Sequence, residues 1–151
     1  MSLNYIDLFA GAGGLSEGFI RAGFEPIAHV EMNKDACDTL KTRTAFHYLR
    51  ENNRIDEYYD YLKGEIFREE FWSKIPDHLI KSVINSEISA ESLPSIFERI
   101  DKELGEKKVD LVIGGPPCQA YSVAGRARDP KGMTEDPRNY LYKYYVEFLK
   151  R

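Results

Sequence analysis

The chain is poor in cysteine and lacks long apolar runs. It has 2 cysteines in 151 residues, and they do not form the C-x-x-C spacing of a metal or redox motif. Such scarcity fits a reducing compartment. No apolar run approaches the roughly 20 residues that span a membrane, and no signal peptide precedes the first apolar segment, which begins after Met1-Ser2-Leu3. We therefore expect a cytoplasmic protein with no membrane partner.

Positive charge is not in excess either. The chain has 21 Lys and Arg against 25 Asp and Glu, a net charge of −4. A self-sufficient DNA-binding module normally carries a basic stripe, so any affinity for DNA must come from a local patch or from another part of the protein. His29, His47 and His78 show no ligand spacing, and we expect no metal. With 42% apolar and 30% charged residues, the chain is expected to form one globular domain.

The first elements read as strand, glycine turn and helix. The apolar segment Tyr5–Phe9 runs into Ala10-Gly11-Ala12-Gly13-Gly14-Leu15, and apolar residues then recur at helical spacing as far as Gly23. This order is typical of a mononucleotide-binding βαβ unit. The glycines permit a tight turn and close approach of a ligand, while the N–H groups at the start of the helix remain free to donate.

An acidic residue ends the second expected strand. Glu31 follows Gly11 at about the 20-residue separation of an acid that binds a ribose diol. This favours an adenosine-containing ligand; the alternative is an acidic strand end that caps the next helix at Asn33. Ser16 replaces the third glycine of G-x-G-x-x-G, which favours a smaller nucleoside ligand over a nicotinamide or flavin dinucleotide.

A second turn places a thiol after an apolar strand. Val109–Ile113 leads into Gly114-Gly115-Pro116-Pro117-Cys118-Gln119, where the prolines fix φ at about −65°. Open α/β sheets bind ligands at the carboxyl ends of their strands. Cys118 is therefore a candidate nucleophile, and the alternative is an inert buried cysteine. We interpret Cys37, in a helical stretch, as a packing residue.

Four motifs, in this order, resemble the DNA (cytosine-5) methyltransferase family: Asp7–Gly14, Glu31-Met32, Gly115–Ser122 and Asp136–Tyr142. The resemblance implies an α/β, Rossmann-like S-adenosylmethionine-dependent methyltransferase fold, a parallel sheet with helices on both faces. The fold is expected to be incomplete, because the family's later Glu-Asn-Val motif does not occur. Residues 1–151 would form the N-terminal, cofactor-binding and nucleophile-bearing part of a catalytic domain, with a helical insertion at about 44–78.

The resemblance also implies roles for single residues. S-adenosylmethionine is expected at Phe9, Ala10, Gly11, Gly13, Gly14, Leu15, Glu31, Met32, Glu87, Ile88, Pro117 and Leu141. Glu31 would bind the ribose hydroxyls and Met32 would pack on the adenine. Cys118 would add as a thiolate to C6 of a cytosine flipped out of the duplex, so that C5 accepts the methyl group. DNA contacts are expected at Gln119, Ser122, Arg126 and Arg128; for the arginines the alternative is a solvated loop with balancing acids.

The expected partners are double-stranded DNA with a flipped-out cytosine and a C-terminal portion or second subunit that supplies the absent motifs, in an enzyme paired with restriction. An open edge on the fourth strand predicts self-association, and the fragment alone should be inactive. Two alternatives stay open from the residues: an adenosine-ligand-binding or regulatory domain without catalysis, and a nicotinamide-dependent oxidoreductase.

The expected elements are strands at 4–9, 25–30, 79–84 and 109–113, with helices at 13–22, 33–43, 94–104 and from 138 onward. Right-handed crossovers predict a parallel sheet in the order 3-2-1-4. The insertion is rich in aromatic residues: Tyr48, Tyr58, Tyr59, Tyr61, Phe67 and Phe71. We expect two or three short helices packed on the sheet; the alternative is an aromatic platform for unpaired bases.

Overall fold

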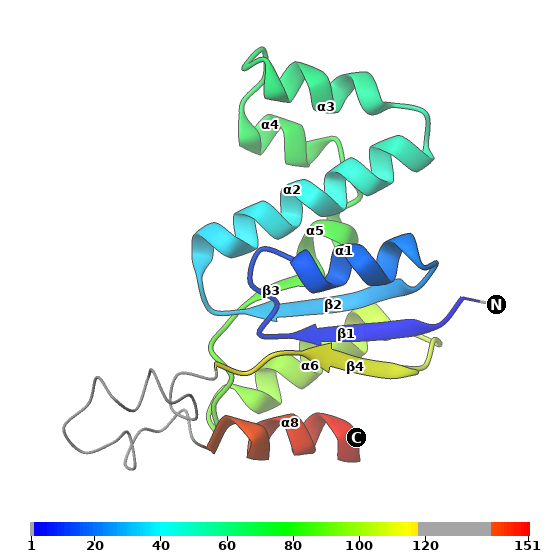
Figure 1. Cartoon of the computed structure of the whole chain (residues 1–151). Coiled ribbons are helices and arrows are strands. Elements are labelled where there is room, and N and C mark those ends of the chain that lie inside the picture. The colour runs from blue at the N-terminus through cyan, green and yellow to red at the C-terminus, as the bar shows by residue number, and fades with distance from the viewer. Residues whose placement is uncertain (1, 118–139) are drawn as a thin grey trace.

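The computed structural model describes residues 2–117 and 140–151. Its centre is a parallel sheet of β1 (Asn4–Leu8), β2 (Glu25–Glu31), β3 (Val83–Asn85) and β4 (Leu111–Gly114), in the order β3-β2-β1-β4. The expected strand order is confirmed. The arrowheads of β1, β2 and β4 point to the same end of the molecule in Figure 1.

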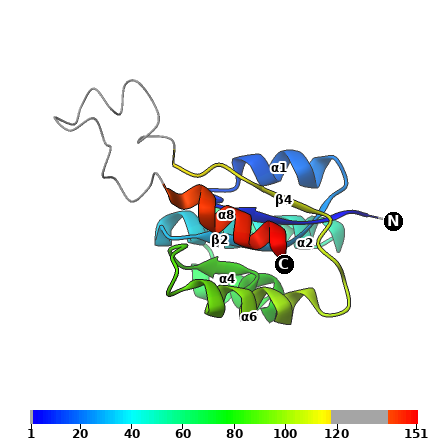
Figure 2. The ribbon, with the colours of Figure 1, turned by 90° about the horizontal axis from the view of Figure 1, so that it is seen from below.

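Helices lie on both faces of this sheet. The helices of the described residues are α1 (Gly14–Arg21), α2 (Lys34–Glu51), α3 (Ile55–Leu62), α4 (Arg68–Ser73), α5 (Asp77–Lys81), α6 (Leu93–Leu104) and α8 (Leu141–Lys150), of which α3 and α4 pack against α2 and not directly on the sheet. Figure 2 shows α1 and α6 on opposite faces of the sheet. The expected α/β class is confirmed, and among the described residues β4 pairs on one side only, with β1.

The main core lies between the sheet and α6. Ile6, Leu8, Val30 and Ile84 come from the strands, and they meet α6 residues that recur at helical spacing, Ile96 and Ile100. From α8, Phe148 joins the same cluster, with its ring centroid 4.9 Å from that of Phe97. The apolar faces of α6 and α8 therefore fix the start of α8 near the carboxyl ends of the strands.

The insertion packs on α2 and not on the sheet. α2 continues to Glu51, well past the expected end at residue 43, and α3 and α4 lie against it on the side away from β4 (Figure 1). A separate buried cluster of Ala45, Leu49, Phe71 and Ile75 joins these helices. Tyr61 stacks on Phe71 at 4.5 Å between ring centroids. Packing is thus confirmed for Tyr48, Tyr58, Tyr61 and Phe71, whereas Tyr59 and Phe67 are exposed. The expected packing on the sheet is wrong for α3 and α4.

The third strand is shorter and later than expected. Residues Asp77–Lys81 form α5, and only Val83–Asn85 pair with β2, so the expected strand at 79–84 is wrong. Pro76 precedes the helix, and an ion pair joins Asp77 and Lys81 one turn apart. Leu79 and Ile80 pack against the cluster of Ala45, Leu49, Phe71 and Ile75, which we call the insertion cluster. Apolar residues that matched a buried strand are thus the partly buried side of a short helix.

Within residues 2–117 and 140–151, no helix has both the length and the apolar character needed to cross a membrane.

Candidate functional site

A cavity of about 360 Å³ opens at the carboxyl ends of the strands. Its walls come from segments far apart in the sequence: the residues after β1, β2, β3 and β4, and the start of α8. The lining residues are Phe9, Val30, Glu31, Met32, Ser86, Glu87, Ile88, Ser89, Gly115, Pro117, Leu141 and Tyr144. This volume lies in the range of about 300–1,000 Å³ that is typical of small-molecule sites.

Many of the residues expected at a cofactor line this cavity together: Phe9, Glu31, Met32, Glu87, Ile88, Pro117 and Leu141. The others, Ala10, Gly11, Gly13, Gly14 and Leu15, do not line it and belong instead to the turn and first helical residues after β1. The structure therefore brings most of the expected set to one place.

Glu31 ties two loops together at this cavity. Its Oε2 accepts a hydrogen bond from the Gly11 N–H at 2.8 Å, and its Oε1 accepts one from the Asn33 N–H at 2.7 Å. Asn33 in turn caps α2, because its Oδ1 accepts from the Ala36 N–H at 3.0 Å. The two interpretations of Glu31 from the sequence are thus compatible: it supports the helix start and also faces the cavity.

The glycine turn needs its glycines. Gly11 and Gly13 have φ of +55° and +87°, in the left-handed region that favours glycine. A Cβ on Gly13 would lie 2.7 Å from Leu40 Cδ2 on α2, so the Leu40 side chain would have to shift to admit it. The turn is therefore held close to α2, with the Gly11 N–H directed at Glu31.

Phe9 has a left-handed backbone with φ of +55°, although it is not glycine. Such a conformation costs of order 1–3 kcal/mol and persists where the surroundings hold it, often at binding sites. Here the strained residue is one of those that line the cavity.

Ser16, at the position of the third fingerprint glycine, is buried and hydrogen-bonded. Its Oγ lies 2.8 Å from His29 Nε2 and also contacts the Tyr5 hydroxyl. Burial raises the pKa of Tyr5 to about 12 and lowers that of His29 to about 4. All three groups are therefore neutral at pH 7, and they join α1 to β1 and β2 beneath the glycine turn.

Several residues at the cavity were not anticipated from the sequence: Val30, Ser86, Ser89, Gly115 and Tyr144. The two serines follow β3, whose position the sequence pattern misplaced. Tyr144 lies one turn after Leu141 on α8, and this helical spacing is the signal that identifies it.

The expected nucleophile Cys118 and the expected DNA contacts Gln119, Ser122, Arg126 and Arg128 lie outside the described residues. In the described part of the chain, no group of three or more His, Cys, Asp or Glu residues is placed to hold a metal ion.

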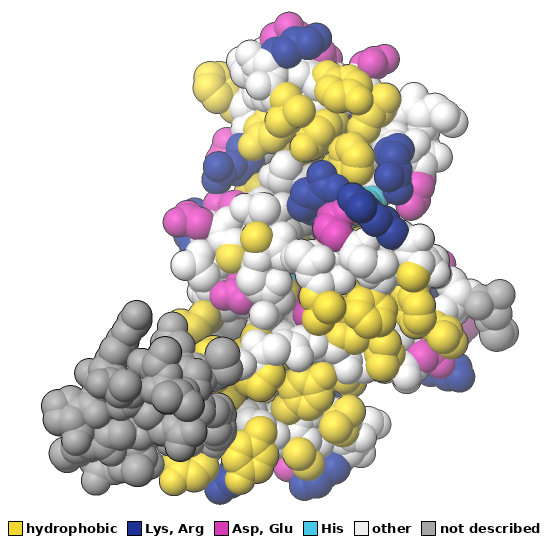
Figure 3. All heavy atoms as spheres, in the orientation of Figure 1, with side chains coloured by type: hydrophobic (Ala, Val, Ile, Leu, Met, Phe, Trp, Pro, Cys, Tyr) yellow, Lys and Arg dark blue, Asp and Glu magenta, His cyan; other side chains and the backbone are white. Residues whose placement is uncertain are grey.

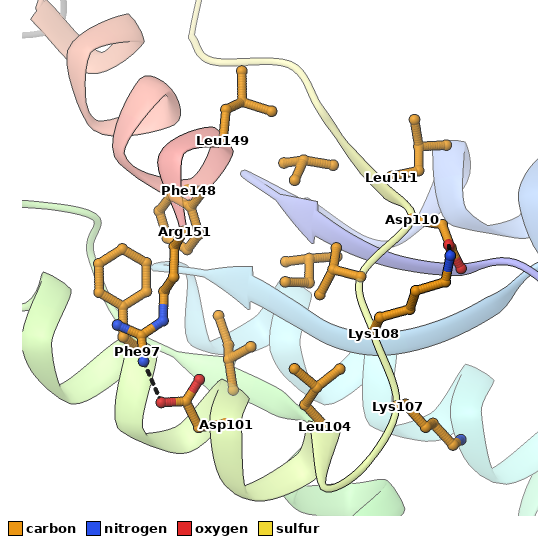
Figure 4. Close-up of a pocket in the computed structure, with 14 residues that line it drawn as sticks. Phe97, Asp101, Leu104, Lys107, Lys108, Asp110, Leu111, Phe148, Leu149 and Arg151 are labelled. Carbon is orange, nitrogen blue, oxygen red and sulfur yellow. Dashed lines mark hydrogen bonds and ion pairs between the residues drawn. The ribbon is translucent and has the colours of Figure 1, made fainter.

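A second cavity of about 520 Å³ lies between β4, α6 and α8. Figure 4 shows Phe97, Leu104, Leu111, Phe148 and Leu149 around it, with an ion pair between Arg151 and Asp101. Among the described residues, none of those expected to bind the cofactor lines this cavity. It is therefore a separate apolar groove beside the strand at the end of the sheet.

Fold and cavity together define an α/β protein with a ligand site at the carboxyl ends of parallel strands. The chain belongs to the C-5 cytosine-specific DNA methylase family, whose profile matches residues 3–67 and 69–151.

Curated type II methyltransferases are similar to this chain over nearly its whole length. The type II methyltransferase M.Bpa9945I of Bacillus paralicheniformis is 38% identical over 164 residues, covering 95% of this chain and 37% of the relative. The type II methyltransferase M1.HphI of Haemophilus parahaemolyticus is 36% identical over 150 residues, covering 99% of this chain and 30% of the relative. The chain thus spans about a third of the length of these relatives. No solved structure matches it.

Proposed function

We propose that this chain is the S-adenosylmethionine-binding and nucleophile-bearing N-terminal part of a DNA (cytosine-5) methyltransferase catalytic domain, with its helical insertion at about 44–78. The observation that carries the proposal is the convergence of Phe9, Glu31, Met32, Ile88 and Leu141 on one cavity in a chain of this family. These residues come from three of the four motifs and, for Ile88, from the segment after β3, and folding brings them together.

The cavity suits an adenosine-containing methyl donor. Glu31 faces it with a carboxylate that already accepts two backbone N–H groups; a carboxylate has about four lone-pair sites, so it can also accept from two ribose hydroxyls. Phe9, Met32 and Ile88 offer apolar surface for an adenine ring. Glu87 is exposed at the same wall and supplies an acceptor for an amino group.

The chemistry assigned to this chain centres on Cys118. Bound S-adenosylmethionine would supply a methyl group on a positively charged sulfur. The Cys118 thiolate would add to C6 of the target cytosine, which makes C5 nucleophilic. After C5 is methylated, loss of the C5 proton would expel the thiolate and restore the ring. Gln119, Ser122, Arg126 and Arg128 would contact the flipped nucleotide and its phosphates.

The partners follow from this chemistry. They are double-stranded DNA and the polypeptide that supplies the remaining family motifs, either as a C-terminal portion or as a second subunit. The relatives' description as type II methyltransferases supports a pairing with restriction, and a cytoplasmic location follows from the DNA substrate.

Calorimetric titration with S-adenosylhomocysteine and with NAD tests the binding step. We expect binding heat with S-adenosylhomocysteine and none with NAD. A Glu31→Ala variant should bind S-adenosylhomocysteine more weakly by about 1.5–3 kcal/mol, the range for hydrogen bonds to a charged group. A folded Glu31→Ala chain with unchanged affinity, or a wild-type chain that binds only NAD, contradicts the proposal.

A covalent trap tests the nucleophile. In a full-length enzyme that carries this segment, DNA with 5-fluorocytosine should form a denaturant-resistant adduct, because fluorine at C5 cannot leave as the proton does. Cys118→Ala should abolish the adduct, and Cys37→Ala should leave it intact. An adduct that survives in the Cys118→Ala enzyme means that another residue attacks C6.

A further inference from the structure

Glu31, the last residue of β2, and Met32, which begins the following turn, are hydrogen-bonded to the end of the neighbouring strand β3. The Asn85 side-chain amide donates to the backbone oxygen of Glu31 at 3.1 Å and to that of Met32 at 2.9 Å. The Ser86 N–H donates to the Glu31 oxygen as well, at 3.0 Å. Two consecutive peptide groups of the turn are therefore fixed to β3.

These contacts extend the tie that Glu31 makes to the glycine turn. The Glu31 side chain accepts from the Gly11 N–H, and the Glu31 backbone oxygen accepts from the Asn85 amide. These hydrogen bonds join the carboxyl ends of β1, β2 and β3 along the rim of the cavity. Asn85 itself does not line the cavity. Its hydrogen bonds to Glu31 and Met32, which do line the cavity, give it an indirect effect on a bound molecule.

We propose that Asn85 is a positioning residue for the nucleoside part of the ligand. It sets the direction of the Glu31 carboxylate, and by this contact it tunes affinity for the ribose. This inference rests on the proposed function above. The amide suits the task because its one nitrogen carries two N–H donors and no charge, so it binds two carbonyl oxygens. An aspartate would offer no donor when ionised and would add a negative charge near Glu31.

If Asn85 only stabilised the fold, its replacement would lower the stability of the free chain and leave ligand affinity unchanged. Asn85 is exposed, so its removal leaves no cavity, and water can replace the lost hydrogen bonds. Water does not hold the two carbonyl groups in one orientation. The loss should therefore appear in ligand affinity more than in the stability of the free chain.

The matched control is Asn52, which is also exposed and whose side-chain amide donates to the Tyr48 oxygen at 2.8 Å, at the end of α2. S-adenosylhomocysteine is titrated into the wild-type chain and into Asn85→Ala, Asn85→Asp and Asn52→Ala variants, with calorimetry or NMR as the readout. We expect both Asn85 variants to raise Kd about 3- to 10-fold, which corresponds to a net hydrogen bond of typical strength. Asn52→Ala should leave Kd unchanged, with a melting temperature close to that of Asn85→Ala.

A double-mutant cycle identifies the route. If Asn85 acts through Glu31, the Asn85→Ala change should raise Kd much less in a Glu31→Ala background than in the wild type. Equal losses in both backgrounds, or an unchanged Kd in both folded Asn85 variants, overturn the inference while the proposed function stands. A wild-type chain that binds no S-adenosylhomocysteine overturns the proposed function and this inference together.

Discussion

Asp7 places a carboxyl group in the middle of the sheet. It is 1% exposed, and neither oxygen has a hydrogen-bond partner among the described residues. Burial, with a smaller contribution from the nearby charge of Glu31, raises the pKa of Asp7 to about 7. Its β2 neighbour is His29, whose pKa burial lowers to about 4. Each side chain is thus driven toward its neutral form.

The two residues affect stability with opposite signs. For Asp7 the folded pKa exceeds the unfolded value, so its favourable contribution is full below about pH 4 and is lost as the pH rises to about 7. For His29 the folded pKa is depressed, so its contribution is full above about pH 6.5 and is lost as the pH falls toward 4. Over the shared interval the two effects oppose each other.

Substitution of Asp7 separates its contribution to the pH dependence of stability from that of His29. An Asp7→Asn variant should gain stability relative to the wild type, by about 2–4 kcal/mol, as the pH rises from 4 to 8, because it lacks the buried charge. Urea unfolding at several pH values measures this difference. A His29→Gln variant provides a control, since its difference from the wild type should change in the opposite direction. If Asp7→Asn parallels the wild type at every pH, Asp7 does not ionise in this interval.

Residue types and their order predicted much of the candidate site. The separation of Gly11 from Glu31 placed a carboxylate beside the glycine turn, and the hydrogen bond between them is present at 2.8 Å. Asn85 had no comparable signal, because its importance depends on which strand end lies beside which. Local spacing cannot supply that information.

At the level of elements, the junction of β1 and β4 depends on a close backbone contact. Gly114 ends β4 with φ of +134°, and a Cβ there would lie 1.9 Å from the Leu8 backbone oxygen. Gly114→Ala should therefore destabilise the chain by about 3 kcal/mol or more, since neither the strand nor the carbonyl can move freely. Thermal unfolding measures the loss.

Gly115 provides the matched control for this substitution. Among the described residues, a Cβ on Gly115 meets no atom within 4 Å, so Gly115→Ala should change the melting temperature little. Similar losses in the two variants would mean that chain flexibility, and not the contact with Leu8, explains the requirement for Gly114.

The elements that were misjudged share a cause. The pattern of α2 gave no clear end near residue 43, and the apolar residues Leu79 and Ile80 matched a buried strand as well as a helix face. The length of α2 and the helical conformation of Leu79 and Ile80 depend on packing in the insertion cluster, which contains Phe71 and Ile75 from other segments. A short apolar run does not distinguish a strand from a helix without such tertiary contacts.

For the molecule as a whole, the groove beside β4 is the clearest exposed apolar feature at that end of the sheet. Leu149 lines this groove and is 61% exposed, next to a strand that pairs only with β1 in the described part of the chain. Val146, also on α8, is 39% exposed. Figure 3 shows yellow apolar side chains along the lower part of this face. Unpaired strand edges and apolar surface favour association.

Self-association should therefore depend on this end of the molecule. A Leu149→Lys variant should shift the isolated chain toward monomer in sedimentation velocity runs. Leu62→Lys is the control, because Leu62 is 59% exposed but lies on α3, away from β4. A wild-type chain that is monomeric at all concentrations, or equal effects of the two lysines, contradicts a role for the β4 end.

The division of the core into separate clusters has a consequence for proteolysis. The insertion cluster shares no buried residue with the main core, and Phe67, between α3 and α4, is 83% exposed. Limited chymotrypsin treatment should cut after Phe67 first. The two pieces should stay together, because Arg68 pairs with Asp38 at 2.9 Å and Phe71 remains buried against α2. A nicked chain with unchanged ligand affinity would show that an unbroken backbone through the insertion is not needed to hold the ends of β2 and β3 at the cavity.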